Sequence, residues 1–174
     1  EEGTYTLQNR NQGVFGRYML DGEMKRWRGS VDEISQIPSA AEDVRLSEVD
    51  SRMQVFVTKG APTDANFKTS GQGIELVPVT HPNDLFTGEP VAFRFLLDGE
   101  PAADLEVTLI RHGIRYRDQV DEIIVKTDAK GQVNLEFSEP GMYWLEAETE
   151  QDSKLLEGAK RRLSYSATLE VLPL

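Results

Sequence analysis

The sequence contains no cysteine, and this absence removes several classes of function at once. Without cysteine the chain cannot form disulfides, zinc ribbons, thiol nucleophiles or haem attachment sites. It has only two histidines, so nucleophilic hydrolysis would have to take its general base from His81 or His112. No serine lies in a Gly-x-Ser-x-Gly motif, and no glycine-rich segment continues into the Gly-Lys-Ser/Thr of a phosphate loop. We therefore expect a protein that is not an enzyme.

Long apolar runs are also missing. No segment approaches the stretch of about 18 apolar residues that a transmembrane helix needs. The first three residues, Glu1, Glu2 and Gly3, have neither the basic region nor the apolar region of a signal peptide. We expect no membrane insertion of this chain.

Positive charge is scarce, with 19 lysines and arginines against 30 aspartates and glutamates and a net charge of −11. Such a chain repels a phosphate backbone, so nucleic acid is not an expected partner. Two short basic clusters, Lys25–Arg28 and Lys160–Arg162, are flanked by acidic or polar residues. We interpret both clusters as solvated surface.

The clearest pattern in the sequence is a series of short β-rich segments from Ile74 to Leu174, separated by turn signals. Their alternation of apolar and polar residues predicts two packed antiparallel sheets, an immunoglobulin-like Greek-key sandwich. Asp98-Gly99 is a strong hairpin signal, and it predicts that residues 91–97 pair with residues 105–110. The expected strands are Ile74–Val79, Val91–Leu97, Leu105–Ile110, Glu122–Lys126, Gln132–Phe137, Tyr143–Glu148 and Ser166–Leu172.

The first 60 residues share a motif with the end of the chain, because Gly3–Leu7 and Gly141–Leu145 both read Gly-x-Tyr-x-Leu. In a sandwich, a tyrosine near the start of the penultimate strand often bonds back to the backbone at a corner. If both tyrosines do so, residue 1 lies near the end of a preceding domain. We therefore interpret residues 1–60 as the C-terminal part of a first β-sandwich with an irregular insertion, residues 61–72 as a linker and residues 73–174 as a second sandwich.

Two local signals predict secondary structure within residues 1–60. Asp21-Gly22 lies between short β-like runs and predicts a hairpin over residues 16–27. Ser30 and Glu33 have the spacing of a capping box, which predicts one or two helical turns before Pro38.

Metal binding is one candidate function. His81 and Asp84 place an imidazole and a carboxylate on one tight loop, and His112 follows a predicted strand that could end nearby. Imidazole and carboxylate together suit nickel, cobalt, zinc or copper. Two histidines so far apart in sequence form no recognised metal motif, so a surface histidine beside an Asn-Asp turn is the competing interpretation.

Aromatic side chains offer a second kind of site. Trp27 lies between two arginines, and Trp144 has the same strand parity as the acidic residues Glu146 and Glu148. We predict both tryptophans as partner-binding residues, with cross-strand packing as the competing interpretation. Glycan binding would instead require the aromatic side chains to share one exposed face.

A set of motifs along the chain resembles a bacterial domain family of unknown function whose members are often labelled as periplasmic components of nickel or cobalt uptake. The match extends over about residues 3–172. The motifs that carry the resemblance are Phe56–Pro62, Gly73–Asp84, Gly88–Pro90, Phe95–Pro101, Lys126–Gly131 and Pro140–Leu145.

The resemblance implies an exported periplasmic protein of a Gram-negative bacterium, with a signal peptide in its precursor and a sandwich domain preceding this chain. Our leading hypothesis is a non-enzymatic periplasmic binding or accessory protein for uptake of nickel or cobalt, with the residues selected above, His81, Asp84 and His112, as candidate ligands. The alternative is an interaction module that docks on an envelope transporter or an outer-membrane receptor.

Overall fold

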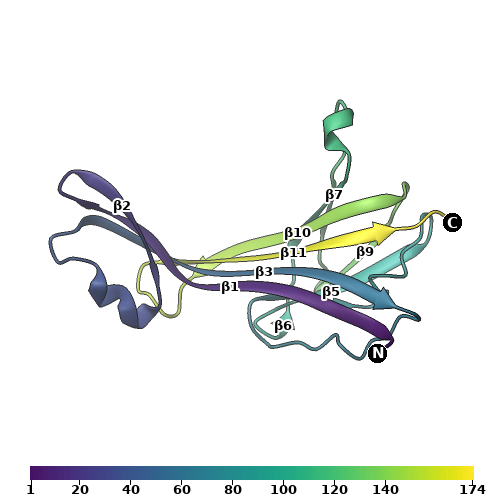
Figure 1. The fold of residues 1–174 in the computed structure, drawn as a ribbon, viewed down its shortest axis with the longest axis horizontal. Coiled ribbons are helices and arrows are strands. Elements are labelled where there is room, and N and C mark those ends of the chain that lie inside the picture. The colour runs from purple at the N-terminus through teal and green to yellow at the C-terminus, as the bar shows by residue number, and fades with distance from the viewer. The chain divides into compact units, whose positions relative to one another are not determined.

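The computed structural model describes residues 1–174 and confirms an all-β, sandwich-like fold, with 57% of the residues in strands and 5% in helices (Figure 1). The immunoglobulin-like assignment stays a prediction. All seven predicted strands are present, and several extend further than the sequence pattern indicated. The elements are β1 (Gly3–Leu20), β2 (Glu23–Gly29), η1 (Val31–Gln36), β3 (Glu42–Lys59), β4 (Ile74–Pro78), β5 (Pro90–Leu97), β6 (Glu100–Pro101), β7 (Glu106–Arg111), η2 (Ile114–Tyr116), β8 (Ile123–Lys126), β9 (Gln132–Glu136), β10 (Gly141–Asp152) and β11 (Lys160–Val171).

The strands form two sheets. One is seven-stranded, in the order β2-β1-β3-β11-β10-β7-β8. The other is four-stranded, in the order β4-β5-β6, and its fourth strand, β9, also pairs with β5. The β10–β7 pair and the pairs that β5 makes with its neighbours are antiparallel.

The chain divides into two compact units that are discontinuous in sequence. Unit 1 comprises residues 1–9, 52–148 and 164–174, and unit 2 comprises residues 10–51 and 149–163. The segment predicted as a linker, residues 61–72, contains no helix or strand and belongs to unit 1.

The core of unit 1 lies between its two sheets. Phe95 of β5 and Tyr165 of β11 are fully buried, and their ring centroids are 6.0 Å apart in an edge-on arrangement. Burying large apolar side chains is the main contribution to the stability of such a domain. The alternation predicted for β10 is confirmed, because Tyr143, Leu145 and Ala147 are all buried.

Both Gly-x-Tyr-x-Leu motifs form the same backbone contact within unit 1. The hydroxyl of Tyr143 donates to the carbonyl of Glu139 at 2.8 Å, and the hydroxyl of Tyr5 donates to the carbonyl of Glu1 at 2.8 Å. The two rings differ in environment, because Tyr143 is buried whereas 43% of Tyr5 is exposed. The predicted tyrosine corner at Tyr143 is therefore confirmed.

The predicted pairing of residues 91–97 with residues 105–110 is wrong. The Asp98-Gly99 turn leads from β5 into the two-residue strand β6, and β7 pairs instead with β10 and β8 in the other sheet. The pairing ends at Ala102, whose N–H donates to the Phe95 carbonyl at 3.0 Å, because the Phe95 N–H donates instead to the carbonyl of Gly131. Thr127 then fixes the crossing: its hydroxyl accepts from the N–H of Leu105 at 2.8 Å, and its N–H donates to the Leu105 carbonyl at 3.0 Å.

A buried ion pair joins β3 to β4 in unit 1. The guanidinium of Arg52 lies 2.9 Å from the carboxylate of Glu75, and both side chains are almost fully buried. The same carboxylate accepts from the N–H groups of Ser70 and Gly71. Burial opposes ionisation of Glu75, but these hydrogen bonds and the charge of Arg52 outweigh it and lower its pKa. The irregular segment before β4 is thereby tied to the sheet.

Unit 2 contains the predicted hairpin and the predicted helix. β1 and β2 pair around the Asp21-Gly22 turn. The helix forms as η1, and the N–H of Ser30 donates to the carboxylate of Glu33 at 2.8 Å, as a capping box requires.

A polar network in unit 2 centres on Asp50 of β3. Arg10 donates to both of its carboxylate oxygens, Gln12 donates at 3.1 Å, and Arg161 lies 3.5 Å away. Burial opposes ionisation of Asp50, but these partners outweigh it and lower its pKa. The basic clusters were interpreted as solvated surface, yet Arg161 is mostly buried within this network.

Candidate functional site

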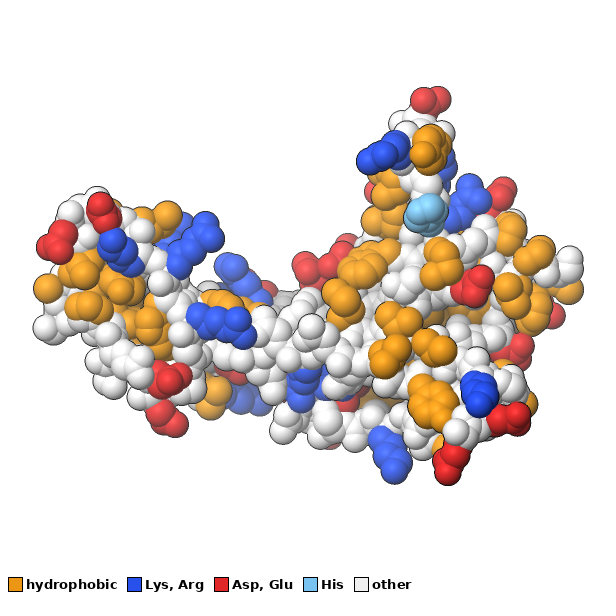
Figure 2. Space-filling model, in the orientation of Figure 1, with side chains coloured by type: hydrophobic (Ala, Val, Ile, Leu, Met, Phe, Trp, Pro, Cys, Tyr) orange, Lys and Arg blue, Asp and Glu red, His pale blue; other side chains and the backbone are white.

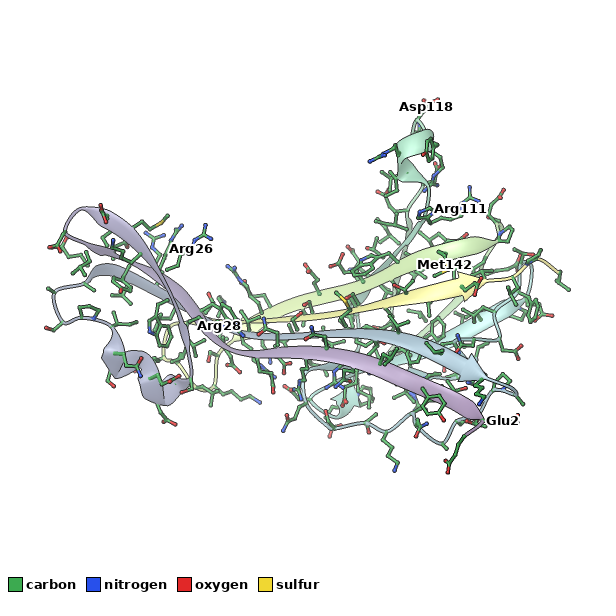
Figure 3. All side chains as sticks on the ribbon, viewed as in Figure 1. Glu2, Arg26, Arg28, Arg111, Asp118 and Met142 are labelled. Atoms are coloured by element: carbon green, nitrogen blue, oxygen red, sulfur yellow. The ribbon has the colours of Figure 1, made fainter.

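The loop between β7 and β8 projects from unit 1 and carries the short helix η2 (Figure 1). Gly113 begins it in the left-handed conformation, at a φ of 88°, which glycine adopts without a steric penalty. The guanidinium of Arg117 donates to the carbonyl of Arg111 at 2.6 Å and lies 3.6 Å from Asp121. Figure 3 shows Asp118 at the tip of this loop and Arg111 nearer the sheet. Arg117 therefore braces the loop internally.

A hollow of about 610 Å³ lies between this loop and the outer face of the sheet; we call it the loop hollow. Its floor is built by β7 and β10, where Trp144 pairs directly with Ile110 and the N–H of His112 donates to the carbonyl of Met142 at 2.8 Å. Figure 2 shows hydrophobic side chains gathered on this face of unit 1. The residues lining the hollow are Ile110, Arg111, His112, Gly113, Ile114, Arg115, Tyr116, Met142, Tyr143, Trp144 and Thr168.

The loop hollow combines an apolar floor with a basic edge. Three apolar side chains are well exposed there: Tyr116 at 85%, Ile114 at 46% and Met142 at 41%. Arg111 and Arg115 line the same hollow in a protein whose net charge is −11. Exposed tryptophan, tyrosine and arginine are the residue types that contribute most to protein–protein binding energy.

His81, one of the predicted metal ligands, lies within a hydrogen-bond network of unit 1. Its Nδ1 accepts from the N–H of Asn83 at 3.0 Å, and its Nε2 is 3.0 Å from the hydroxyl of Thr4. Its ring centroid is 5.2 Å from that of Phe67. A neutral histidine with this acceptor at Nδ1 carries its proton on Nε2, so the ring has no free lone pair for a metal.

The other two predicted ligands are more accessible. Asp84 is exposed, and its N–H donates to the carbonyl of His81 within the predicted turn. His112 is exposed in the loop hollow. No group of three or more His, Cys, Asp or Glu side chains in the structure could hold a metal ion, so these three residues do not form a chelating site together.

The structure separates the two predicted partner-binding tryptophans by unit. Trp144 is half-buried on the floor of the loop hollow, which His112 also lines. Trp27 is half-buried in β2 of unit 2, and its ring packs so closely over Gly29 that a Cβ there would lie 2.7 Å from it. Much of Trp27 is therefore engaged in packing within unit 2.

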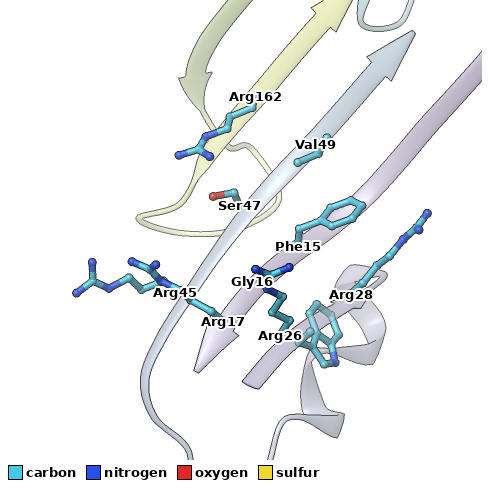
Figure 4. Close-up of a pocket in the computed structure, with 10 residues that line it drawn as sticks. Phe15, Gly16, Arg17, Arg26, Arg28, Arg45, Ser47, Val49 and Arg162 are labelled. Carbon is cyan, nitrogen blue, oxygen red and sulfur yellow. The ribbon is translucent and has the colours of Figure 1, made fainter. Parts of the chain in front are cut away.

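Sequence reasoning missed a second hollow, of about 760 Å³, in unit 2 (Figure 4). Five arginines line it, together with Phe15, Ser47 and Trp27, one of the two predicted partner-binding residues; we call this surface the arginine face. The signal was present, because a hairpin that turns at residues 21–22 places residue 17 opposite residue 26, and residue 28 follows residue 26 by two, so all three share one face. The arginines are Arg17, Arg26, Arg28, Arg45 and Arg162.

The chain belongs to the DUF4198 family, described as a domain of unknown function, whose family model matches residues 1–151. This agrees with the resemblance drawn from the sequence motifs at the level of a family without an assigned function. A search of the curated proteins found no match. None of the helices is long and apolar enough to cross a membrane.

Proposed function

We propose that the chain is a non-enzymatic accessory protein of the bacterial periplasm that docks on an envelope transporter or an outer-membrane receptor. The loop hollow is the docking site. The observation that carries this proposal is the joint exposure of Tyr116, Ile114 and Met142 around Trp144 on one hollowed surface. A large apolar surface that a protein leaves open to water is typical of an interaction site.

The basic edge of the loop hollow defines the partner further. Arg115 makes no ion pair, and Arg111 pairs only with the exposed Glu139 at 3.2 Å. Exposed ion pairs of this kind contribute little, so a carboxylate of a partner can replace Glu139 at small cost. The matching partner segment carries an apolar side chain for the floor and an acidic side chain for the edge.

Site-specific cross-linking tests this proposal. A photo-reactive amino acid replaces Tyr116 in cells, and a matched one replaces Leu155, which is 60% exposed in unit 2. We expect one envelope protein to be captured at position 116 and not at position 155. With that protein purified, Trp144→Ala should weaken binding at least tenfold, because a central aromatic residue contributes about 2 kcal/mol or more. Equal capture at both positions, or unchanged affinity of Trp144→Ala, would contradict the proposal.

Nickel or cobalt uptake stays a prediction from the family resemblance. Metal titration of the purified protein and two histidine variants tests it separately from docking. Calorimetry with nickel and cobalt is carried out on the wild-type protein, on His112→Ala and on His81→Ala. If the chain carries such an ion through its exposed imidazole, His112→Ala abolishes the heat and His81→Ala does not. Absence of heat from the wild-type protein would leave docking as the function.

A further inference from the structure

The arginine face is a regular feature of one sheet surface. It extends over four neighbouring strands, β2, β1, β3 and β11. Adjacent strands are about 4.8 Å apart, so the outermost arginines stand on strands separated by about 14 Å. Figure 4 shows the labelled arginine side chains gathered around Phe15 and Ser47.

Two of these arginines, Arg17 and Arg26, repel each other. Arg17 and Arg26 are directly opposite each other in the β1–β2 pair, so their side chains leave the same face of the sheet. Like charges in directly opposed positions destabilise a sheet. Both side chains are exposed, and neither makes an ion pair or a side-chain hydrogen bond in the structure. A local arrangement that lowers stability and makes no compensating contact within the protein is typical of a functional site.

The remaining arginines hold only weak partners. Arg45 pairs with Asp43 and Arg162 pairs with Glu150, each at 3.1 Å and each at the surface. Arg28 stacks over the Phe15 ring at 5.0 Å and donates to the Asn11 side chain. Exposed ion pairs contribute little to stability, so an incoming anion can displace them.

On the opposite face of the same strands, the arginines are paired with carboxylates. There Arg10 binds the Asp50 carboxylate through two hydrogen bonds, and Arg161 lies 3.1 Å from Glu48. The strand alternation thus places mostly buried, ion-paired arginines on one face and arginines without strong partners on the other. Within unit 2, the mostly buried arginines therefore have carboxylate partners in the fold, whereas Arg17 and Arg26 have none.

We propose that the arginine face binds a small ligand that carries several phosphate or carboxylate groups. Guanidinium groups match such oxyanions through two parallel hydrogen bonds each. A volume of about 760 Å³ is within the range of small-molecule sites. Five arginines on four strands can engage several anionic groups of one ligand.

The surrounding charges favour a small ligand over an extended anionic surface. Unit 2 has ten arginines and lysines against eleven aspartates and glutamates, and the whole chain has a net charge of −11. The positive field of the arginine face is screened beyond a Debye length of about 8–10 Å. A lipid bilayer or a nucleic acid would extend past it and meet acidic residues, whereas a compact anion would not.

Calorimetric titration with inorganic tripolyphosphate tests the proposal. The key variant is Arg17→Gln with Arg26→Gln, and the control is Arg94→Gln, which removes an exposed arginine of unit 1. We expect the wild type and the control to bind with equal affinity, and the double variant to bind at least tenfold more weakly. Absence of wild-type binding, or equal binding by the double variant, would overturn the proposal.

Thermal denaturation shows that any loss of binding in the double variant is not a loss of folding. Removing two opposed charges should leave its melting temperature unchanged or higher without ligand. Tripolyphosphate should then raise the melting temperature of the wild type but not that of the double variant.

Binding to vesicles that contain phosphatidylglycerol is measured as well, to separate a small ligand from a membrane. Binding to these vesicles without binding to tripolyphosphate would assign the surface to membranes and overturn the small-ligand proposal.

Discussion

At the scale of single residues, the charged side chains of this protein divide into those that hold the fold and those that remain available. Arg52 and Glu75 belong to the first group. They are buried as an ion pair, and the Glu75 carboxylate also accepts hydrogen bonds from the N–H groups of Ser70 and Gly71. Arg17 and Arg26 belong to the second group, because they are exposed without partners. The residue type alone does not distinguish the two groups.

Glu75→Gln should destabilise the protein by about 3–5 kcal/mol, because it leaves the buried guanidinium of Arg52 without its counter-charge. Equilibrium urea unfolding near neutral pH measures this loss. Glu136→Gln, at an exposed position of β9, is the matched control and should change stability by less than about 0.5 kcal/mol.

The same variant gives a pH dependence of known sign. The pKa of Glu75 is lower in the folded protein than in the unfolded chain. Its stabilising contribution is therefore present above the unfolded pKa, about 4.3, and is lost as the pH falls through the folded value. The difference between wild type and Glu75→Gln should shrink as the pH is lowered below about 4. A difference that stays constant across this range would contradict the assignment.

At the scale of elements, local pattern was a good guide to strands and a poor guide to their partners. The alternation in Tyr143, Leu145 and Ala147 revealed which face of β10 is buried, since a strand has a period of two. The Asp98-Gly99 turn was found, but its partner strand was not. Pairing of β7 with β10 brings together residues more than thirty positions apart, such as Leu109 and Leu145, and no local signal encodes it.

The candidate site was predictable only in part for a related reason. Trp144 and His112 were each selected for their chemistry, but the register that brings them to one hollow is a property of the folded sheet. The alternation that places Arg17, Arg26 and Arg28 on one face could be read from the hairpin itself. Arg45 and Arg162 join that face only through sheet order, which the sequence pattern did not provide.

The turn before β9 offers a test of one such non-local contact. A Cβ at Gly131 would lie 2.3 Å from the carbonyl oxygen of Phe95, and its φ is 75°. Gly158 has a similar φ of 72° but nothing within 4 Å of an added Cβ. Gly158→Ala should cost about 1–2 kcal/mol from the left-handed conformation alone, and Gly131→Ala should cost clearly more. Urea unfolding of the two variants compares them, and equal losses would show that the contact has no effect.

At the scale of the whole molecule, the buried apolar residues are distributed very unequally. Of the 22 buried hydrophobic residues, only Val14 and Leu163 belong to unit 2. The structure of unit 2 therefore depends more on strand pairing and on the Asp50 network than on apolar burial. Elements with few buried apolar contacts open at lower free energy than a packed core does.

Hydrogen exchange should show this difference directly. We expect amides of β2 and of the adjoining part of β3 in unit 2 to exchange faster than amides of β5 and β7 in unit 1. After correction for the intrinsic exchange rate, the protection of unit 2 should fall at low pH as Asp50 becomes protonated, because its lowered pKa makes its ionised form part of the folded state. Uniform protection of both units would contradict the expectation.

The small core of unit 2 also has a consequence for how the protein can change over evolutionary time. Few of its positions are constrained by the shape of a packed interior, so most substitutions there are tolerated as long as strand pairing and the Asp50 network are kept. The ligand chemistry of its exposed face can then diverge among related proteins without loss of the fold. In a comparison of such relatives, the sandwich core of unit 1 should preserve the common ancestry while the surface of unit 2 reflects each protein's specialisation.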